Sequence, residues 1–302
     1  MRRWYHRQLA GGGGRAERAG LGNPAGTEDF SIMKIEVRDL TYVYTDRSTE
    51  KVALEGVNLT IEDGSLFGVI GPNGCGKTTF LHLLGEIKEP TSGSIVFTGE
   101  QRSEQRSAMV FQNFALMPWR YTRGNVGFGP EVKGAPKRIY RRIAEFFLGK
   151  VRLQGTETLY PAQLSGGMKQ RAGIGRALAT SPEVLLLDEP FAQIDPQARV
   201  LLRQELEDLW KRENKTFVYV THNLEEAVLL CDRVAVFSAG PGRVLEVVEV
   251  PLARPRTFDS MSDPAFARTV KRIWKNLESE VEKALIEPVQ TKKPSGIRKW
   301  SR

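Results

Sequence analysis

Residues 71–79 read GPNGCGKTT, a glycine-rich stretch that follows the apolar run SLFGVI and leads into the helix-like sequence KTTFLHLLGEI. This stretch fits the pattern G-x-x-x-x-G-K-[ST] between a strand and a helix, the context in which that pattern forms a phosphate-binding loop. The glycines let backbone N–H groups turn toward a polyphosphate, and the start of the following helix adds the positive end of its dipole. The sequence therefore predicts a nucleotide site at the end of a buried strand.

The side chains of this loop divide into binding groups and a structural one. Lys77 can reach the β- and γ-phosphates, and the Thr78 hydroxyl can bind Mg²⁺. No histidine or other base is adjacent to Cys75 in sequence, so we interpret Cys75 as a structural residue and not as a catalytic thiol. The predicted nucleotide-binding residues of the loop are Gly71, Pro72, Asn73, Gly74, Cys75, Gly76, Lys77, Thr78 and Thr79.

Polar side chains that suit phosphate chemistry follow three other strand-like runs. VLLLDEP ends in two carboxylates, of which Asp188 suits Mg²⁺ and Glu189 can orient or deprotonate an attacking water. The alternative for this pair is a turn that the two carboxylates merely satisfy. His222 closes the run TFVYVTH, where it can lie near the γ-phosphate, although a lone histidine is more often structural. Gln112 follows SAMVF and can hold Mg²⁺ or water through its amide carbonyl.

The chain alternates short β-branched runs with helical stretches, which predicts an α/β fold with a largely parallel sheet. Residues 113–170 lack strand-like runs and contain the helical sequence APKRIYRRIAEFFLGKV, so we interpret them as a helical insertion. The expected strands are 34–44, 65–70, 93–99, 183–190, 216–222 and 233–238, and further helices are expected at 196–213 and 223–231.

The two ends of the chain differ from its centre. Residues 1–32 are rich in Gly, Ala and Arg without an apolar period, so we expect a disordered extension, with Met33 as a candidate translation start. Near the other end, Asp263 suits an N-cap and Pro264 the first helical position. One face of residues 263–285 carries the apolar residues Phe266, Val270, Ile273, Trp274, Leu277, Val281 and Leu285. This stripe predicts a helix docked on its own domain, and the alternative is a helix that binds a membrane surface or a partner. We expect the last fifteen residues to form a loose basic tail.

Charge and composition exclude several classes of protein. The net charge is +8, but residues 33–253 carry equal numbers of basic and acidic residues, so the basic excess belongs to the ends. A neutral centre argues against nucleic acid as the partner. No stretch reaches the roughly 18 apolar residues that a membrane span needs. The two cysteines in the sequence indicate a reducing compartment and no disulfide framework.

The ordered set GPNGCGKTT, VFQ, LSGGMKQR, VLLLDEP and VTH resembles the ATP-binding cassette (ABC) family over about residues 34–255. The LSGG signature separates that family from other P-loop NTPases. The resemblance implies an α/β fold with a RecA-like mixed β-sheet core, an antiparallel β subdomain and a helical signature subdomain at about 113–170. The ATPase domain would span residues 33–255, and residues 256–302 would form a C-terminal helical extension with a basic tail.

In this family two copies pack head to tail, and each signature loop completes the nucleotide site of its partner. The resemblance therefore implies that Ser165, Gly166 and Gly167 contact the γ-phosphate bound to the other copy. The segment AQID at 192–195 departs from the family pattern S-A-L-D, because the aspartate is kept and the serine is not. Hydrolysis remains the expectation, and the departure concerns communication between the subunits.

The resemblance also assigns roles within one copy. Glu189 would be the catalytic base and His222 the γ-phosphate sensor. Gln112 would couple Mg²⁺ to the helical subdomain. Tyr44 would stack on adenine, in preference to Tyr42.

A narrower resemblance links the chain to importer ATPases for nitrate, sulfonate, taurine and bicarbonate, through NFALMPWR after Gln112 and GPGRVLEVVEVPLARPR at 240–256. It implies ATP and Mg²⁺ as cofactors, a transmembrane permease as partner, and an extracytoplasmic substrate-binding protein acting indirectly. The chain would be peripheral on the cytoplasmic face of the membrane, with a permease helix in a groove near residues 112–119. The alternatives are the ATPase of an exporter or lipid-handling system, and a soluble cassette acting on DNA or ribosomes.

Overall fold

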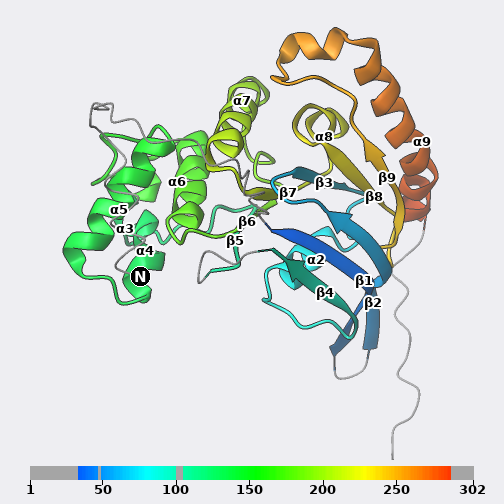
Figure 1. Cartoon of the computed structure of the whole chain (residues 1–302), viewed down its shortest axis with the longest axis horizontal. Helices are drawn as coiled ribbons and strands as arrows, with labels where there is room; N and C mark the ends of the chain where they lie inside the picture. The colour runs from blue at the N-terminus through cyan, green and yellow to red at the C-terminus, as the bar shows by residue number, and fades with distance from the viewer. Residues whose placement is uncertain (1–32, 47–48, 100–104, 287–302) are drawn as a thin grey trace, which may run out of the picture. The chain divides into compact units, whose positions relative to one another are not determined.

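The computed structural model describes residues 33–46, 49–99 and 105–286. The predicted extension at 1–32 and the predicted basic tail lie outside these residues. Within them, the strands form a six-stranded sheet and a three-stranded antiparallel sheet (Figure 1). The larger sheet has the order β5 (Ser107–Val110), β6 (Val184–Asp188), β7 (Thr216–Thr221), β3 (Leu66–Ile70), β8 (Arg233–Phe237) and β9 (Val244–Glu249).

The larger sheet is parallel except for β9, which runs antiparallel to β8. Every residue of β3, β6 and β7 is buried. This explains why these strands read as continuous apolar runs, since parallel strands covered on both faces have no solvent-facing side. The predicted mixed-sheet core is confirmed, and the loops that follow its parallel strands meet at one edge.

The smaller sheet consists of β2 (Thr49–Ile61), β1 (Lys34–Asp46) and β4 (Ser92–Thr98), in that order. The start of β1 alternates between buried and half-buried residues, as a strand with one covered face does. The sequence did not predict β2, although it provides the other long strand of this sheet. The antiparallel β subdomain implied by the family resemblance is confirmed.

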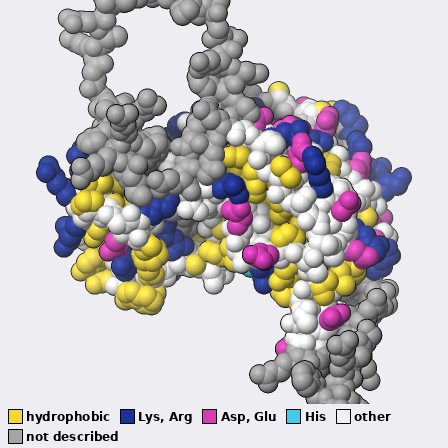
Figure 2. Space-filling model, turned by 60° about the horizontal axis from the view of Figure 1, so that its bottom comes forward, with side chains coloured by type: hydrophobic (Ala, Val, Ile, Leu, Met, Phe, Trp, Pro, Cys, Tyr) yellow, Lys and Arg dark blue, Asp and Glu magenta, His cyan; other side chains and the backbone are white. Residues whose placement is uncertain are grey.

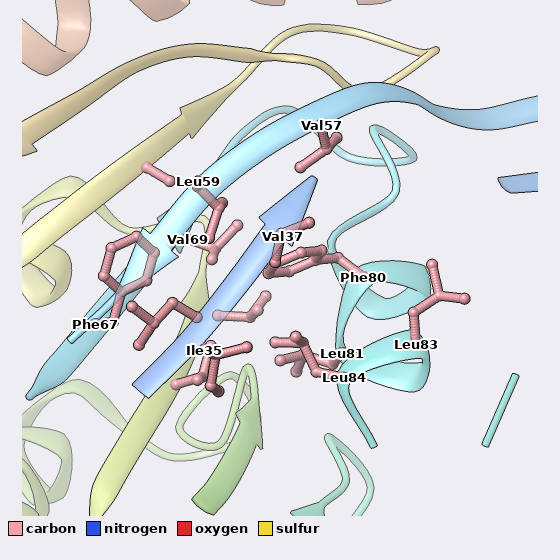
Figure 3. Close-up of a cluster of buried hydrophobic side chains, with 14 of the residues drawn as sticks. Ile35, Val37, Val57, Leu59, Phe67, Val69, Phe80, Leu81, Leu83 and Leu84 are labelled. Atoms are coloured by element: carbon pink, nitrogen blue, oxygen red, sulfur yellow. The ribbon is translucent and has the colours of Figure 1, made fainter. Parts of the chain in front are cut away.

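Helix α2 (Lys77–Leu84) packs between the two sheets. Figure 3 shows its apolar side chains facing those of β1, β2 and β3, and the cluster includes Ile35, Val37, Val57, Leu59, Phe67, Val69, Phe80, Leu81, Leu83 and Leu84. Each fully buried side chain of this size contributes about 1.5–3 kcal/mol relative to an exposed one. This core fixes where α2 begins, and therefore where the preceding glycine-rich loop lies.

Four helices lie between β5 and β6 in the chain: α3 (Thr122–Val126), α4 (Phe128–Val132), α5 (Lys137–Lys150) and α6 (Gly166–Leu178). The structure describes all of residues 113–170 and places no strand among them. A one-turn 3₁₀ helix, η1 (Pro161–Gln163), precedes α6. No helix in the described part of the chain is both long enough and apolar enough to cross a lipid bilayer.

Two helices begin shortly after the carboxyl ends of parallel strands, one after β6 and one after β7. Helix α7 (Pro196–Glu213) begins at Asp195, whose side chain accepts a hydrogen bond from the Ala198 N–H (2.9 Å). Helix α8 (Leu224–Leu230) begins at Asn223, whose side chain accepts from the Glu226 N–H (2.9 Å). These N-caps satisfy backbone donors that the first helical turn leaves unpaired.

Helix α9 (Pro264–Ile286), preceded by the 3₁₀ helix η2 (Phe258–Ser262), packs against α8, β8 and β9. Asp263 accepts from the Ala265 N–H (2.7 Å), the bond expected of the predicted cap. Of the predicted apolar face, Phe266, Ile273 and Leu277 are buried, whereas Trp274 is 43% exposed. The helix is therefore docked on its own chain.

We expect Ile273→Ala to lower the free energy of unfolding by about 2–5 kcal/mol, because it leaves a cavity in the contact between α9 and the sheet. Urea denaturation followed by circular dichroism measures this change. Lys275→Ala on the exposed face of α9 is the matched control and should shift it by about 0.5 kcal/mol or less. Equal effects of the two substitutions would show that α9 is not held by its buried face.

Candidate nucleotide-binding site

The glycine-rich loop connects β3, a central strand of the larger sheet, to α2. Gly74 and Gly76 have φ angles of +78° and +101°, which residues with a side chain rarely adopt. A Cβ on Gly76 would lie 2.7 Å from the Ala53 carbonyl oxygen of β2. The glycine pattern therefore reflects both the turn itself and the close approach of β2.

Lys77 lies inside this loop. Its Nζ donates to the carbonyl oxygens of Gly71 (2.9 Å) and Pro72 (3.0 Å), and the side chain is buried. The ammonium is thus held at the centre of the turn, where a point charge with three donors can bind phosphate oxygens. Cys75 is also buried, and burial raises the pKa of its thiol, in keeping with a structural role.

Thr78 and Asp188 meet across the gap between α2 and β6. The Thr78 hydroxyl lies 3.0 and 3.2 Å from the two carboxylate oxygens of Asp188 and donates to them. Burial raises the pKa of Asp188, the Thr78 bond opposes this shift, and the neighbouring Glu189 adds to it. A hydroxyl and a carboxylate are ligands that suit Mg²⁺.

Among the residues described, no group of three or more His, Cys, Asp or Glu side chains could hold a metal ion. An ion at Thr78 and Asp188 would therefore take most of its remaining ligands from phosphates and water. Mg²⁺ is commonly bound in this way, through one or two protein oxygens and a substrate phosphate. The donor set fits Mg²⁺ that arrives with a nucleotide.

Glu189 and His222 follow the neighbouring strands β6 and β7. Glu189 Oε2 lies 2.9 Å from His222 Nδ1, so the ring donates to the carboxylate when Nδ1 carries the proton. Glu189 has a φ of +42°, and its N–H donates to the Val220 carbonyl (3.0 Å). Backbone in this region is costly for a residue with a side chain and is concentrated at functional sites. The Glu189 carboxylate thereby lies at the edge where the parallel strands end, beside the glycine-rich loop.

A cavity of about 270 Å³ lies over the loop, with residues from β1, β2, the loop, α2 and the end of β6 around it. Tyr44 borders it, and its hydroxyl lies 3.0 Å from Thr79 Oγ1. Tyr42 packs edge-on against Tyr44 (4.9 Å between ring centroids) and does not line the cavity. The full lining is Tyr44, Lys51, Ala53, Asn73, Gly74, Gly76, Lys77, Thr78, Thr79 and Glu189.

Lys51 is a cavity residue that the sequence analysis missed. It lies on β2, opposite Tyr44 in the β1–β2 register. The only signal that could have found it is the strand pairing itself, since a single lysine in an unrecognised strand looks like any exposed lysine. Its ammonium can add positive charge at the open side of a bound polyphosphate.

The remaining predicted residues do not line this cavity. Gln112 is exposed and follows β5, the neighbour of the Asp188 strand. Ser165 caps α6, where its side chain accepts from the Met168 N–H (3.3 Å). Ser165 and Gly166 are exposed and Gly167 is half-buried. The signature loop therefore contributes nothing to the nucleotide cavity of its own chain and is open to another molecule.

A buried lysine in a glycine-rich turn, with a threonine–aspartate pair and a strand-end glutamate beside it, defines the P-loop class of nucleotide-binding proteins. Residues 54–192 match the ABC transporter family. The chain is 42% identical over 259 residues to an uncharacterized ABC transporter ATP-binding protein of Methanocaldococcus jannaschii, covering 85% of this chain and 96% of that protein. It is 44% identical over 218 residues to the taurine import ATP-binding protein TauB of Escherichia coli (strain K12), covering 71% and 85%.

Solved structures of ABC transporter cassettes also resemble this chain. The dimeric structure of a bacterial ABC transporter cassette superposes with a TM-score of 0.62 at 28% identity, covering 72% of this chain and all of that one. A dimeric post-hydrolysis state bound to ADP and Pi gives the same TM-score at 27% identity, with the same coverage. The chain therefore belongs to the family of ABC transporter ATP-binding proteins. It is an ATP-binding subunit whose ATP hydrolysis is coupled to transport, and the predicted fold is confirmed.

We expect Asp188→Asn to raise the melting temperature of the protein without nucleotide or Mg²⁺ at pH 7.5. The raised pKa of Asp188 means that folding disfavours its charged form, so this group costs stability above its folded pKa. Asparagine removes the charge and keeps an oxygen for Thr78. The gain should vanish as the pH falls below 3.8, the ordinary pKa, because the carboxyl is then neutral in both the folded and the unfolded chain. Asp208→Asn, exposed on α7, is the control in differential scanning calorimetry. A lower melting temperature for Asp188→Asn would contradict the burial argument.

Proposed function

We propose that the chain is the ATP-hydrolysing subunit of an importer for small solutes of the nitrate, sulfonate and taurine type. The similarity to a taurine import ATP-binding protein carries this proposal. In this proposal the ATPase domain spans residues 33–255 and is peripheral on the cytoplasmic face of the membrane. A transmembrane permease binds it, and an extracytoplasmic substrate-binding protein acts through that permease.

The positions of the residues around the glycine-rich loop support a separate role for each of them in hydrolysis. Lys77 would bind the β- and γ-phosphates, and Thr78 with Asp188 would hold Mg²⁺. Mg²⁺ would supply positive charge that offsets the developing charge on the phosphates. Glu189 would orient and deprotonate the attacking water, while its bond to His222 keeps the carboxylate and the imidazole together beside the γ-phosphate. Gln112 would reach the ion from the end of β5.

The signature loop would act on the partner subunit. Ser165 and Gly166 are exposed and lie outside the cavity of their own chain, and the superposed cassettes are dimeric. Placed against the Lys77 loop of a second copy, the Ser165 hydroxyl and the start of α6 would contact the γ-phosphate. ATP would then bridge two subunits and stabilise the closed dimer, and hydrolysis would remove that bridge.

An exposed apolar surface suits the permease. Hydrophobic side chains gather on the helical part of the chain, at the left of Figure 2. Trp119 is 74% exposed and Val132 is 69% exposed, which is unusual for side chains of this size. Other large exposed apolar side chains in the helical part of the chain are Tyr121, Phe128 and Tyr160. Trp119 ends the segment 112–119, so a permease helix bound here would touch the chain that follows Gln112.

Mixing two inactive variants should restore hydrolysis if the signature loop acts on its partner. In a mixed dimer of Lys77→Ala and Ser165→Arg, one site combines the altered Lys77 loop with the altered signature loop. The other site combines the two unaltered loops and is intact. Roughly a quarter of the wild-type rate is expected from an equal mixture, since half of the dimers are mixed and each has one working site of two. Phosphate release measures the rate. If mixed dimers form and stay inactive, each signature loop serves its own chain.

Trp119→Ser should abolish co-purification of the permease from membranes while ATP binding is kept, because it removes the most exposed anchor of the apolar surface. Trp274→Ser, which removes an exposed tryptophan from α9, is the matched control and should leave the permease bound.

The purified complex, reconstituted in vesicles with ATP on the cassette side, should accumulate taurine, an alkylsulfonate or nitrate on that side. This accumulation should require the substrate-binding protein on the opposite side. Transport away from the cassette side would identify an exporter and contradict the proposal.

A further inference from the structure

A buried carboxylate lies behind the pair formed by Glu189 and His222. Glu226, on α8, is 4% exposed. Its Oε2 accepts hydrogen bonds from the hydroxyls of Tyr219 (3.0 Å) and Thr221 (3.1 Å), both on β7. Burial raises the pKa of Tyr219, so its hydroxyl keeps the proton that it donates. The other oxygen, Oε1, lies 3.6 Å from Nη1 of Arg199 on α7.

Arg199 reaches back over the loop that follows Glu189. Its Nη2 donates to the Ile194 carbonyl (2.8 Å), and its backbone N–H donates to the Asp195 carbonyl (3.0 Å). The guanidinium thus holds the segment 192–195 by a backbone oxygen. This contact does not depend on the side chains of that segment, which depart from the family pattern.

The same carboxylate fixes the backbone on both sides of His222. Thr221 Oγ1, which donates to Glu226, accepts from the Asn223 N–H (3.0 Å). The Asn223 side chain in turn accepts from the Glu226 N–H (2.9 Å). The two loops meet at a small cavity of about 10 Å³, which is lined by Glu189, Ala192, Arg199, Thr221, His222, Asn223 and Glu226.

We propose that Arg199 and Glu226 are positioning residues for ATP hydrolysis, because their ion pair holds the His222 loop and the segment 192–195 in one arrangement. The proposal rests on the roles proposed above for Glu189 and His222. A buried ion pair is a poor source of stability, since apolar residues of similar volume often stabilise a fold as well or better. Its specific contribution here is geometric: it joins the segments after β6 and β7 that carry the Glu189–His222 contact.

The first test is kinetic. Glu226→Gln keeps an oxygen for the two hydroxyls but loses the charge that faces Arg199, and Arg199→Met loses the contact with Ile194 as well. Each should lower kcat about ten- to a hundredfold, as expected for a small misplacement of reacting groups. The Kd for ATP should stay within about twofold, because neither residue lines the nucleotide cavity. The double variant should be no slower than the slower single one, since both changes break one interaction.

Glu207→Gln is the matched control. Glu207 is equally buried (4% exposed) and pairs with Arg254 (3.0 Å) and Lys211 (2.8 Å), so its loss also disrupts a buried ion pair. It should lower the melting temperature and leave kcat unchanged. An equal loss of kcat in Glu207→Gln, or an unchanged kcat in Glu226→Gln, would overturn the proposal. If Glu226→Gln does not fold, Arg199→Lys replaces it and should retain more activity than Arg199→Met.

A spectroscopic readout separates this inference from the function on which it rests. The chain has three histidines, so the imidazole signals of the ¹³C-histidine-labelled protein can be assigned by their loss in single variants. The His222 signals should shift in Glu226→Gln and stay in place in Glu207→Gln. Unmoved His222 signals in Glu226→Gln would overturn the inference. If Glu189→Gln retained normal hydrolysis, the proposed site would fail, and the His222 signals would still decide whether Glu226 positions the loop.

Discussion

The approach of Gly76 to the Ala53 carbonyl of β2 is the contact on which the nucleotide site depends. The glycine-rich loop can close over Lys77 only because residue 76 has no Cβ, which would collide with the Ala53 carbonyl oxygen. The core around α2 presses the loop and the smaller sheet together, so apolar packing sets the geometry of a polar site. The same packing brings Tyr44 and Lys51 to the edge of the cavity. Residues of the smaller sheet thereby share one cavity with Glu189.

The carboxylates lie at the other side of the loop, where parallel strands end together. Asp188 and Glu189 are adjacent in sequence but have different environments, because the positive φ of Glu189 turns it away from the Thr78–Asp188 contact and toward His222. Burying negative charge at Asp188 opposes stability and favours a cation. The site is therefore arranged for a ligand that brings positive charge with it. In the proposed function, the exposed signature loop would supply its groups to the γ-phosphate site of a second chain.

The sequence predicted those parts of the fold that a short stretch of neighbouring residues determines. The apolar runs of β3, β6 and β7 and the spacing of the glycine-rich loop are visible because burial on both faces and a tight turn restrict residue choice. Strand β2 was missed because its exposed charges interrupt the apolar alternation, and Lys51 was missed with it. Arg199 and Glu226 look like ordinary helix charges until the fold places α7 and α8 side by side. Trp274 was assigned to a buried face, although the neighbouring surface leaves it partly uncovered.

The position of the two cysteines has a practical consequence. Cys75 belongs to the glycine-rich loop and Cys231 follows the last residue of α8. Both are free and buried, and burial raises the pKa of both thiols. Maleimide dyes react with exposed thiolates, so the folded chain should resist labelling as it stands. A single thiol introduced at the exposed position of Asp208 on α7 could then carry a fluorophore without removal of the native cysteines. Energy transfer between two such dyes would follow subunit closure in real time.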